Sequence, residues 1–297
     1  MLTICKSKNG DIITEKGDIL NRWKDHFHEL LSSTEQDERP SIMKDHKDTN
    51  EEDSAPIIEE VEMAVHKLKN YKAPGIENIP AELIKYGGNE LVKHPHTTIK
   101  DIWQKEKMPA ESNISIICPI HKKGGIIESS NYGGVSLLNT AYKILSNILF
   151  ARISPFGENI IGNYQSGFRK NWSTPNQIFA QRQILENTKE FGIETHHLFN
   201  DFKSVYDTIK RNQLYNAMSE FNIPNKLISL KRMTMENTKS QVRIRFDLSD
   251  SIITKKGLKQ CDSLACLLFN LALEKVVRNA GIQTSGTIFY KSVQLLV

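Results

Sequence analysis

The residues most suited to chemistry are two carboxylates, Asp201 and Asp207, that follow a short apolar run beginning at Leu198. An aromatic side chain, Tyr206, stands directly before the second carboxylate. A carboxylate at the end of a buried strand is costly to desolvate unless a cation or hydrogen bonds compensate it, and such positions commonly hold catalytic magnesium. The pattern also fits a helix N-cap after a strand, with Asp207 in solvent, because Asp is a common capping residue.

The composition indicates a globular protein that can bury a core. The chain has 297 residues, of which 39% are hydrophobic and 25% charged, and this balance is ordinary for a folded domain. The net charge of +4 is compatible with nucleic-acid binding. The basic residues come as scattered pairs, however, and most of these pairs are expected on a mixed, solvated surface.

The cysteines and the N-terminus predict an intracellular protein. The cysteines, which show no paired spacing typical of a zinc site, are Cys5, Cys118, Cys261 and Cys266. The first residues are too short and polar a stretch to be a signal peptide, and the longest apolar stretch, Leu264–Val277, is too short to span a bilayer. We therefore expect a nuclear or cytoplasmic location, with neither secretion nor membrane insertion.

The elements that must position the carboxylates are mainly helical in the first third of the chain and mixed afterwards. Apolar periodicity and the Gly and Pro signals predict helices at 18–31, 54–68, 79–87, 90–105, 140–153, 173–189, 212–220, 226–234 and 262–279. A strand is predicted at 114–120, a hairpin at 240–256, and a polar, acidic linker at 32–53. This order predicts an α+β fold, not a regular βαβ wind.

Several segments fall in one recognisable order. They are Lys72–Lys85, Cys118–Gly124, Asn131–Leu138, Tyr164–Arg169, Leu198–Asp207 and Gly257–Leu264. Each segment alone is a weak signal, but their order and spacing make chance similarity improbable. Together they closely resemble the reverse transcriptase of non-LTR retrotransposons, of the RTE-like and long-interspersed-element lineages, over nearly the whole chain from Lys8 to Val297.

The resemblance implies an incomplete right-hand polymerase. Its expected parts are an N-terminal helix and acidic linker at 1–53, a helical N-terminal extension at 54–110, fingers at 111–197 and a partial palm at 198–297. In the family, a Tyr-Ala-Asp-Asp hairpin follows a segment that resembles Thr287–Leu296, and that hairpin supplies two further metal ligands. The hairpin, the thumb and the upstream endonuclease are expected to be missing from this chain.

The resemblance also implies the chemistry. Nucleotidyl transfer by the family uses Mg²⁺, an RNA template, a DNA primer and deoxynucleotides, with two metal ions held by a few carboxylates. Asp201 matches the first of these carboxylates and is the expected catalytic metal ligand. Tyr206 matches the residue beneath the incoming sugar, where a ring excludes a ribose 2′ hydroxyl; the alternative is an aromatic residue of the core. Asp207 is expected to be structural, as a cap of the helix that follows.

Basic and amide side chains complete the implied site. Lys122 and Lys123 match a basic turn of the fingers that faces the triphosphate, with an ordinary exposed turn as the alternative. Gln260 matches a glutamine near the nascent base pair. Arg169 and Lys170 are expected to contact the template backbone, and the alternative for Arg169 is a surface ion pair.

This chain departs from the family pattern at several positions. Gly133 and Trp172 stand where the family has arginine, Cys261 stands where it has glycine, and Ala265-Cys266 replaces its Ser-Pro. We therefore expect a reverse transcriptase domain fragment that is inactive as it stands. One alternative is a non-catalytic nucleic-acid-binding remnant, and another is a chain that folds poorly because strand edges stay unpaired. The sequence does not predict the oligomeric state, the template or any adopted host function.

Overall fold

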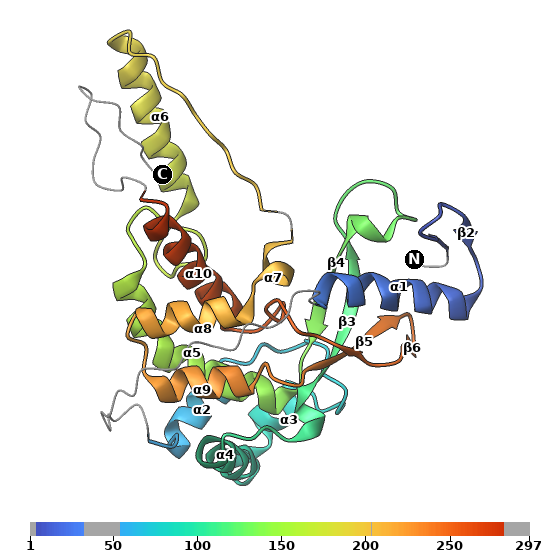
Figure 1. Cartoon of the computed structure of the whole chain (residues 1–297). Coiled ribbons are helices and arrows are strands. Elements are labelled where there is room, and N and C mark those ends of the chain that lie inside the picture. The colour runs from blue at the N-terminus through green and yellow to red at the C-terminus, as the bar shows by residue number, and fades with distance from the viewer. Residues whose placement is uncertain (1–3, 33–53, 203, 282–297) are drawn as a thin grey trace.

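The computed structural model describes residues 4–32, 54–202 and 204–281, which form a helical body beside a small sheet (Figure 1). This mixture of helices and sheet confirms the predicted α+β class. Most of the predicted linker, residues 33–53, lies outside the described residues, as does the segment Thr287–Leu296. None of the described helices combines the length and apolar character that crossing a bilayer requires.

The helical body is built around α5 (Thr140–Ile160), which is capped by Asn139, whose side chain accepts the backbone N–H of Ala141 at 2.9 Å. The helix is apolar on most sides and can therefore be surrounded by other helices. Those around it are α2 (Ile58–His66), α4 (Gly88–Lys105), α9 (Asn225–Met233) and α10 (Ala265–Asn279). The body also contains α3 (Ala81–Tyr86) and α8 (Arg211–Glu220), and α6 (Thr174–Glu190) projects away from it (Figure 1).

The sheet joins strands that are far apart in the sequence. Its central strand, β3 (Ile114–His121), pairs antiparallel with β4 (Tyr132–Leu137) and parallel with β5 (Lys239–Ile244). Strand β5 then pairs antiparallel with the short strands β6 (Asp247–Leu248) and β7 (Ile252–Ile253). The predicted strand at 114–120 and hairpin at 240–256 are thereby confirmed, and β4 is an addition that the sequence analysis did not predict.

The N-terminal helix α1 (Lys16–Leu31) covers one face of this sheet (Figure 1). Its buried side chains Trp23 and Phe27 pack with Ile117 of β3 and Val242 of β5. The close approach depends on Gly134, since a Cβ there would lie 2.8 Å from the Phe27 ring. A small strand pair, β1 (Cys5–Lys6) and β2 (Ile12–Ile13), precedes the helix.

The expectation that the apolar run Leu198–Asp201 forms a buried strand is wrong. These residues form no strand, and Leu198 and Phe199 are 84% and 79% exposed. A strand needs a neighbour to take its backbone N–H and C=O groups, and no strand in the described part of the chain pairs with this run. The apolar side chains there consequently have no sheet face against which to pack.

Candidate nucleotide and nucleic-acid site

Asp201, the expected metal ligand, lies in the exposed run just before α7 (Val205–Thr208). Within residues 4–32, 54–202 and 204–281, its carboxylate has no hydrogen-bond or ion-pair partner, and no group of His, Cys, Asp or Glu side chains there could hold a metal ion. Hard cations such as Mg²⁺ need several oxygen ligands. The described residues therefore do not complete the magnesium site that the family implies.

Tyr206, the expected sugar-contacting residue, is half-buried on α7. Two of its neighbours lie on α10: its hydroxyl donates to the Cys266 Sγ at 3.5 Å, and its ring centroid lies 5.6 Å from that of Phe269. Phe168 contacts the ring edge-on at a centroid distance of 6.2 Å. Burial, together with the bond to Cys266, raises the pKa of Tyr206. The ring is thus held between Phe168 and α10 and stays partly exposed.

Asp207 is buried, with 6% of its surface exposed, so the interpretation as a solvated carboxylate is wrong. It does not cap the following helix either, because the N-cap of α8 is Lys210. The Gln260 Nε2 donates to both Asp207 carboxylate oxygens, at 3.3 and 3.4 Å. Burial raises the pKa of Asp207 to about 6, against the opposing influence of Lys122 and of the bond from Gln260.

Backbone hydrogen bonds hold the α7 segment against the segment Gly257–Gln260. The Leu258 N–H donates to the Tyr206 carbonyl at 2.6 Å, and the Gly257 N–H donates to the Ile209 carbonyl at 2.8 Å. Gly257 has a φ of +80°, and a Cβ there would lie 2.8 Å from the Asp207 carbonyl oxygen, so only glycine permits this approach. We call these paired segments, Tyr206–Ile209 and Gly257–Gln260, the clamp.

Arg211 braces the clamp from the start of α8. Its Nε donates to the Gly257 carbonyl at 3.0 Å, and its Nη2 donates to the Lys256 carbonyl at 3.2 Å. Its Nη1 donates to the carbonyls of Met235 and Thr254 at 2.6 and 3.0 Å. This role of Arg211 was not predicted, because no sequence signal marks a guanidinium that donates to backbone carbonyls.

Lys122 and Lys123 lie exposed in the turn that follows β3, where the Lys122 N–H donates to the Asn131 carbonyl at 2.9 Å. The Lys122 side chain crosses β4 at Gly133, where a Cβ would lie 2.4 Å from the Lys122 Cε. Glycine in place of the family's arginine thus leaves room for the lysine stem. The Lys122 ammonium is near enough to Asp207 to lower the pKa of that carboxyl.

Arg169 and Lys170 differ sharply in their surroundings. The Arg169 side chain is 4% exposed and donates to the carbonyls of Gly162 and Gln165 at 2.9 and 3.1 Å. It also pairs with Glu158 at 2.8 Å, and its guanidinium lies over the Trp172 ring at 4.2 Å. Trp172, at the position where the resemblance implies an arginine, thus stacks on Arg169. Lys170, in contrast, is exposed.

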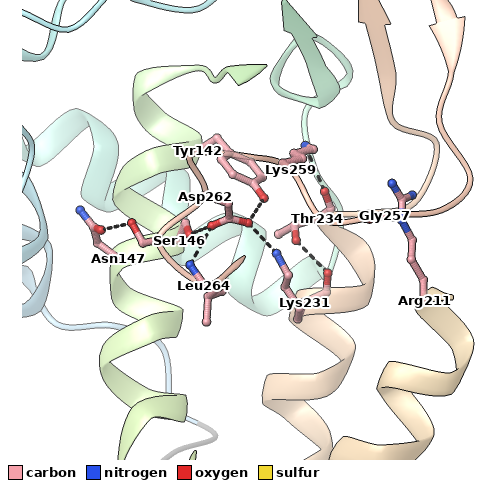
Figure 2. A network of polar contacts seen from close by, with 11 residues as sticks. Tyr142, Ser146, Asn147, Arg211, Lys231, Thr234, Gly257, Lys259, Asp262 and Leu264 are labelled. Carbon is pink, nitrogen blue, oxygen red and sulfur yellow. Dashed lines mark hydrogen bonds and ion pairs between the residues drawn. The ribbon is translucent and has the colours of Figure 1, made fainter. Parts of the chain in front are cut away.

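A buried polar network lies beside the clamp, and the sequence analysis did not predict it (Figure 2). At its centre is Asp262, which accepts from the Lys231 Nζ at 2.8 Å and from the Tyr142 hydroxyl at 2.9 Å. The Ser146 hydroxyl and the Leu264 N–H donate to its other oxygen. Burial alone would raise the pKa of Asp262, but the Lys231 ammonium and these donors lower it to about 2.

Lys259 is a second buried cation in the same network. Its Nζ lies 4.2 Å from the centroid of the Tyr142 ring and donates to the Thr234 carbonyl at 3.4 Å. Burial and the positive charge of Lys231 lower the pKa of Lys259 to about 7, in spite of Asp262. The one sequence signal for this network was the match of Gln260-Cys-Asp262 to the family's Gln-Gly-Asp.

Comparison with known proteins identifies the family. The family model for "Reverse transcriptase (RNA-dependent DNA polymerase)" matches residues 120–290, more than half of the chain. The "Transposon TX1 uncharacterized 149 kDa protein" of Xenopus laevis is 21% identical over 217 residues, which make up 73% of this chain and 17% of that protein. The "Probable RNA-directed DNA polymerase from transposon BS" of Drosophila melanogaster is 24% identical over 220 residues, or 72% of this chain and 24% of that protein.

The chain thus spans at most about a quarter of the length of these relatives. Both relatives carry transposon names, and the family model covers the segments from the last residues of β3 to the end of α10, which include the clamp and the Asp262 network. The predicted resemblance to the reverse transcriptases of non-LTR retrotransposons is confirmed, while the RTE-like subtype stays a prediction. The chain belongs to the reverse transcriptase (RNA-dependent DNA polymerase) family.

Proposed function

We propose that this chain binds a deoxynucleotide beside the clamp and contacts template and primer, but does not extend a primer by itself. The observation that carries the proposal is the clamp, in which backbone bonds bring Tyr206 and Gln260 together. Tyr206 presents a ring to the sugar, Gln260 presents an amide to the base, and Lys122 and Lys123 offer charge to the phosphates. RNA-directed DNA polymerisation is the activity of the family.

The absence of extension is inferred from the surroundings of Asp201. The family's chemistry requires two magnesium ions held by several carboxylates, and Asp201 has no such neighbours in the described residues. The substitutions at Gly133 and Cys261 remove an arginine and add a side chain close to the expected substrate. These features support binding of a nucleotide without turnover.

Nucleotide binding can be tested with a fluorescent deoxyadenosine triphosphate analogue and the purified chain. We expect saturable binding that unlabelled deoxynucleotide competes for better than ribonucleotide. Tyr206→Ala should abolish that preference, whereas Tyr71→Ala should keep it, because Tyr71 is 96% exposed and remote from the clamp in sequence. A preference that survives Tyr206→Ala would exclude the proposed sugar contact.

Primer extension tests the second half of the proposal. With a primer annealed to an RNA template, deoxynucleotides and Mg²⁺, we expect no product longer than the primer. Measurable extension that Asp201→Ala abolishes would overturn this expectation and would make Asp201 a working metal ligand.

A non-catalytic nucleic-acid-binding module is the second candidate, and the exposed basic turn favours it. Lys122, Lys123 and Lys170 are exposed and could meet phosphates without any nucleotide site. This candidate predicts RNA affinity that is micromolar or weaker and that falls steeply with salt, as phosphate-driven binding does. It is favoured if RNA binds in this manner and the fluorescent nucleotide does not, and salt-independent binding would contradict it.

A further inference from the structure

The carboxylate of Asp207 is buried, although it is not one of the expected metal ligands. Its hydrogen-bond donor in the described residues is the Gln260 amide. Burying a carboxylate without an ion pair is costly. Arg211 lies in the lining of the same small cavity, and its guanidinium donates to the backbone carbonyls of Gly257 and Met235.

Other charged groups near Asp207 come from two of the segments packed around it. Lys122 approaches from the turn after β3, and Lys256 and Lys259 line the cavity from the segment after β7. Helix α1 contributes only the apolar side chains Phe27 and Leu31 to that lining. The Gln260 amide is therefore the group whose orientation depends most directly on the Asp207 carboxylate.

We propose that Asp207 is a positioning residue that fixes the orientation of the Gln260 amide and so makes Gln260 a hydrogen-bond acceptor toward the bound nucleotide. An ionised carboxylate can only accept hydrogen bonds. It therefore draws the Gln260 NH₂ group toward itself through both oxygens and turns the Gln260 Oε1 away. The ligand group that this arrangement selects is an N–H or O–H donor of a nucleotide.

Protonation of Asp207 would remove this control. A protonated carboxyl carries its own O–H donor, so the Gln260 amide could present either its oxygen or its nitrogen to it. Burial raises the pKa of Asp207 to about 6, so the change falls between neutral and mildly acidic pH. The inference rests on the proposed function for its nucleotide, but the orientation of Gln260 can be tested without any ligand.

The test is an NMR titration of the chain labelled with ¹⁵N-glutamine, in which loss of one side-chain signal in Gln260→Glu identifies the Gln260 NH₂. We expect this signal to shift with pH, with a midpoint near 6. Asp207→Asn should remove the inflection, since asparagine does not ionise and can face the amide in either orientation. Asp201→Asn is the matched control and should keep the inflection.

The titration of the unmodified chain decides the proposal even if Asp207→Asn folds poorly, because a Gln260 signal without an inflection between pH 5 and 7 overturns it. An inflection that persists in folded Asp207→Asn also overturns it. Nucleotide affinity then tests the proposed function separately: we expect a loss of roughly fivefold between pH 7.5 and 5, the value of one hydrogen bond. If the amide titrates as expected but no nucleotide binds at either pH, the positioning role stands and the proposed nucleotide site is wrong.

Discussion

Asp262 and Asp201 are two carboxylates from neighbouring motifs of one family, and their surroundings are opposites. The Asp262 side chain is 2% exposed, and hydroxyl, ammonium and backbone donors from α5, from α9 and from the N-cap of α10 converge on it. Asp201 is exposed and has no partner in the described residues. The difference lies in what surrounds each residue, because both belong to segments that match the family.

The difference shows that the position of a motif's side chains depends on the elements that pack against the motif. Asp262 lies where α5 and α9 meet, and both helices are anchored by a continuous apolar core. Asp201 follows a run whose apolar side chains, Leu198 and Phe199, lie mostly in solvent. A carboxylate that stabilises the fold can therefore be told apart from an exposed one by measurements of the free energy of unfolding.

The largest effect is expected from Asp262→Asn. This substitution leaves the Lys231 ammonium buried without its counter-charge, and breaking one side of a buried ion pair costs about 3–5 kcal/mol of the free energy of unfolding. The control is Asp250→Asn, which breaks an exposed pair with Lys24 at 3.3 Å and should cost less than about 1 kcal/mol. Urea unfolding at pH 7 measures both values, and similar small losses in the two variants would show that the network does not anchor the fold.

The same pair gives a pH dependence of defined sign. The pKa of Asp262 is about 2 in the folded chain against a reference of 3.8. Its stabilising contribution is therefore complete above pH 4 and is lost as the pH falls from about 4 to about 2. In Asp262→Asn this part of the acid dependence should disappear, and a parallel acid dependence in the two proteins would contradict the assignment.

A smaller effect of opposite sign is expected from Lys259→Met. The pKa of Lys259 is about 7 in the folded chain against a reference of 10.5, so a charged Lys259 opposes folding below pH 7. Removing the charge should raise the free energy of unfolding by about 1–3 kcal/mol at pH 6. The gain should shrink between pH 7 and pH 10.5. Unfolding curves at pH 6 and pH 9 test this, and a loss of stability at pH 6 would show that the ammonium over Tyr142 is favourable.

The sequence predictions succeeded where the cause of a structure is local in the sequence, and they failed where the cause is a distant segment. Helix α3 was predicted closely because Pro80 and Gly87 flank it and such signals are local. The strand at Leu198–Asp201 was wrong because an apolar run does not reveal whether a partner strand lies beside it. The buried pair of Lys231 and Asp262 was not predicted, because lysines are rarely buried and the two partners lie 31 residues apart in the sequence.

For the candidate site, the sequence selected residues but did not predict the contacts that join them. The resemblance selected Tyr206 and Gln260, and the structure places both on the clamp. It did not predict the link between them, because the bonds of the clamp join backbone groups, which carry no residue-specific signal. Strand β4 was missed because Gly133 and Gly134 weaken the strand pattern, although their small size is what lets Lys122 and Phe27 cross it.

Asp207→Asn should stabilise the chain by about 1–2 kcal/mol at pH 7.5. The pKa of Asp207 is about 6 in the folded chain against a reference of 3.8, so its ionised form opposes folding above pH 6. The gain should vanish as the pH falls from about 6 to about 4, where the carboxyl is protonated in both states. Urea unfolding at pH 7.5 and pH 4 measures it. A variant that is less stable at pH 7.5 would mean that the bond from Gln260 outweighs the cost of burial.

The smallest effect is expected from Asp201→Asn, and this null result is what separates the two carboxylates most clearly. An exposed side chain without a partner contributes within about 0.5 kcal/mol to the free energy of unfolding. The same measurement that shows a loss of several kcal/mol for Asp262→Asn should therefore show none for Asp201→Asn. A loss above about 1 kcal/mol would mean that Asp201 has partners in the folded chain beyond the described contacts. Asp201 would then have the same kind of structural role as Asp262, and the lack of neighbouring ligands in the described residues could no longer be the reason for expecting no primer extension.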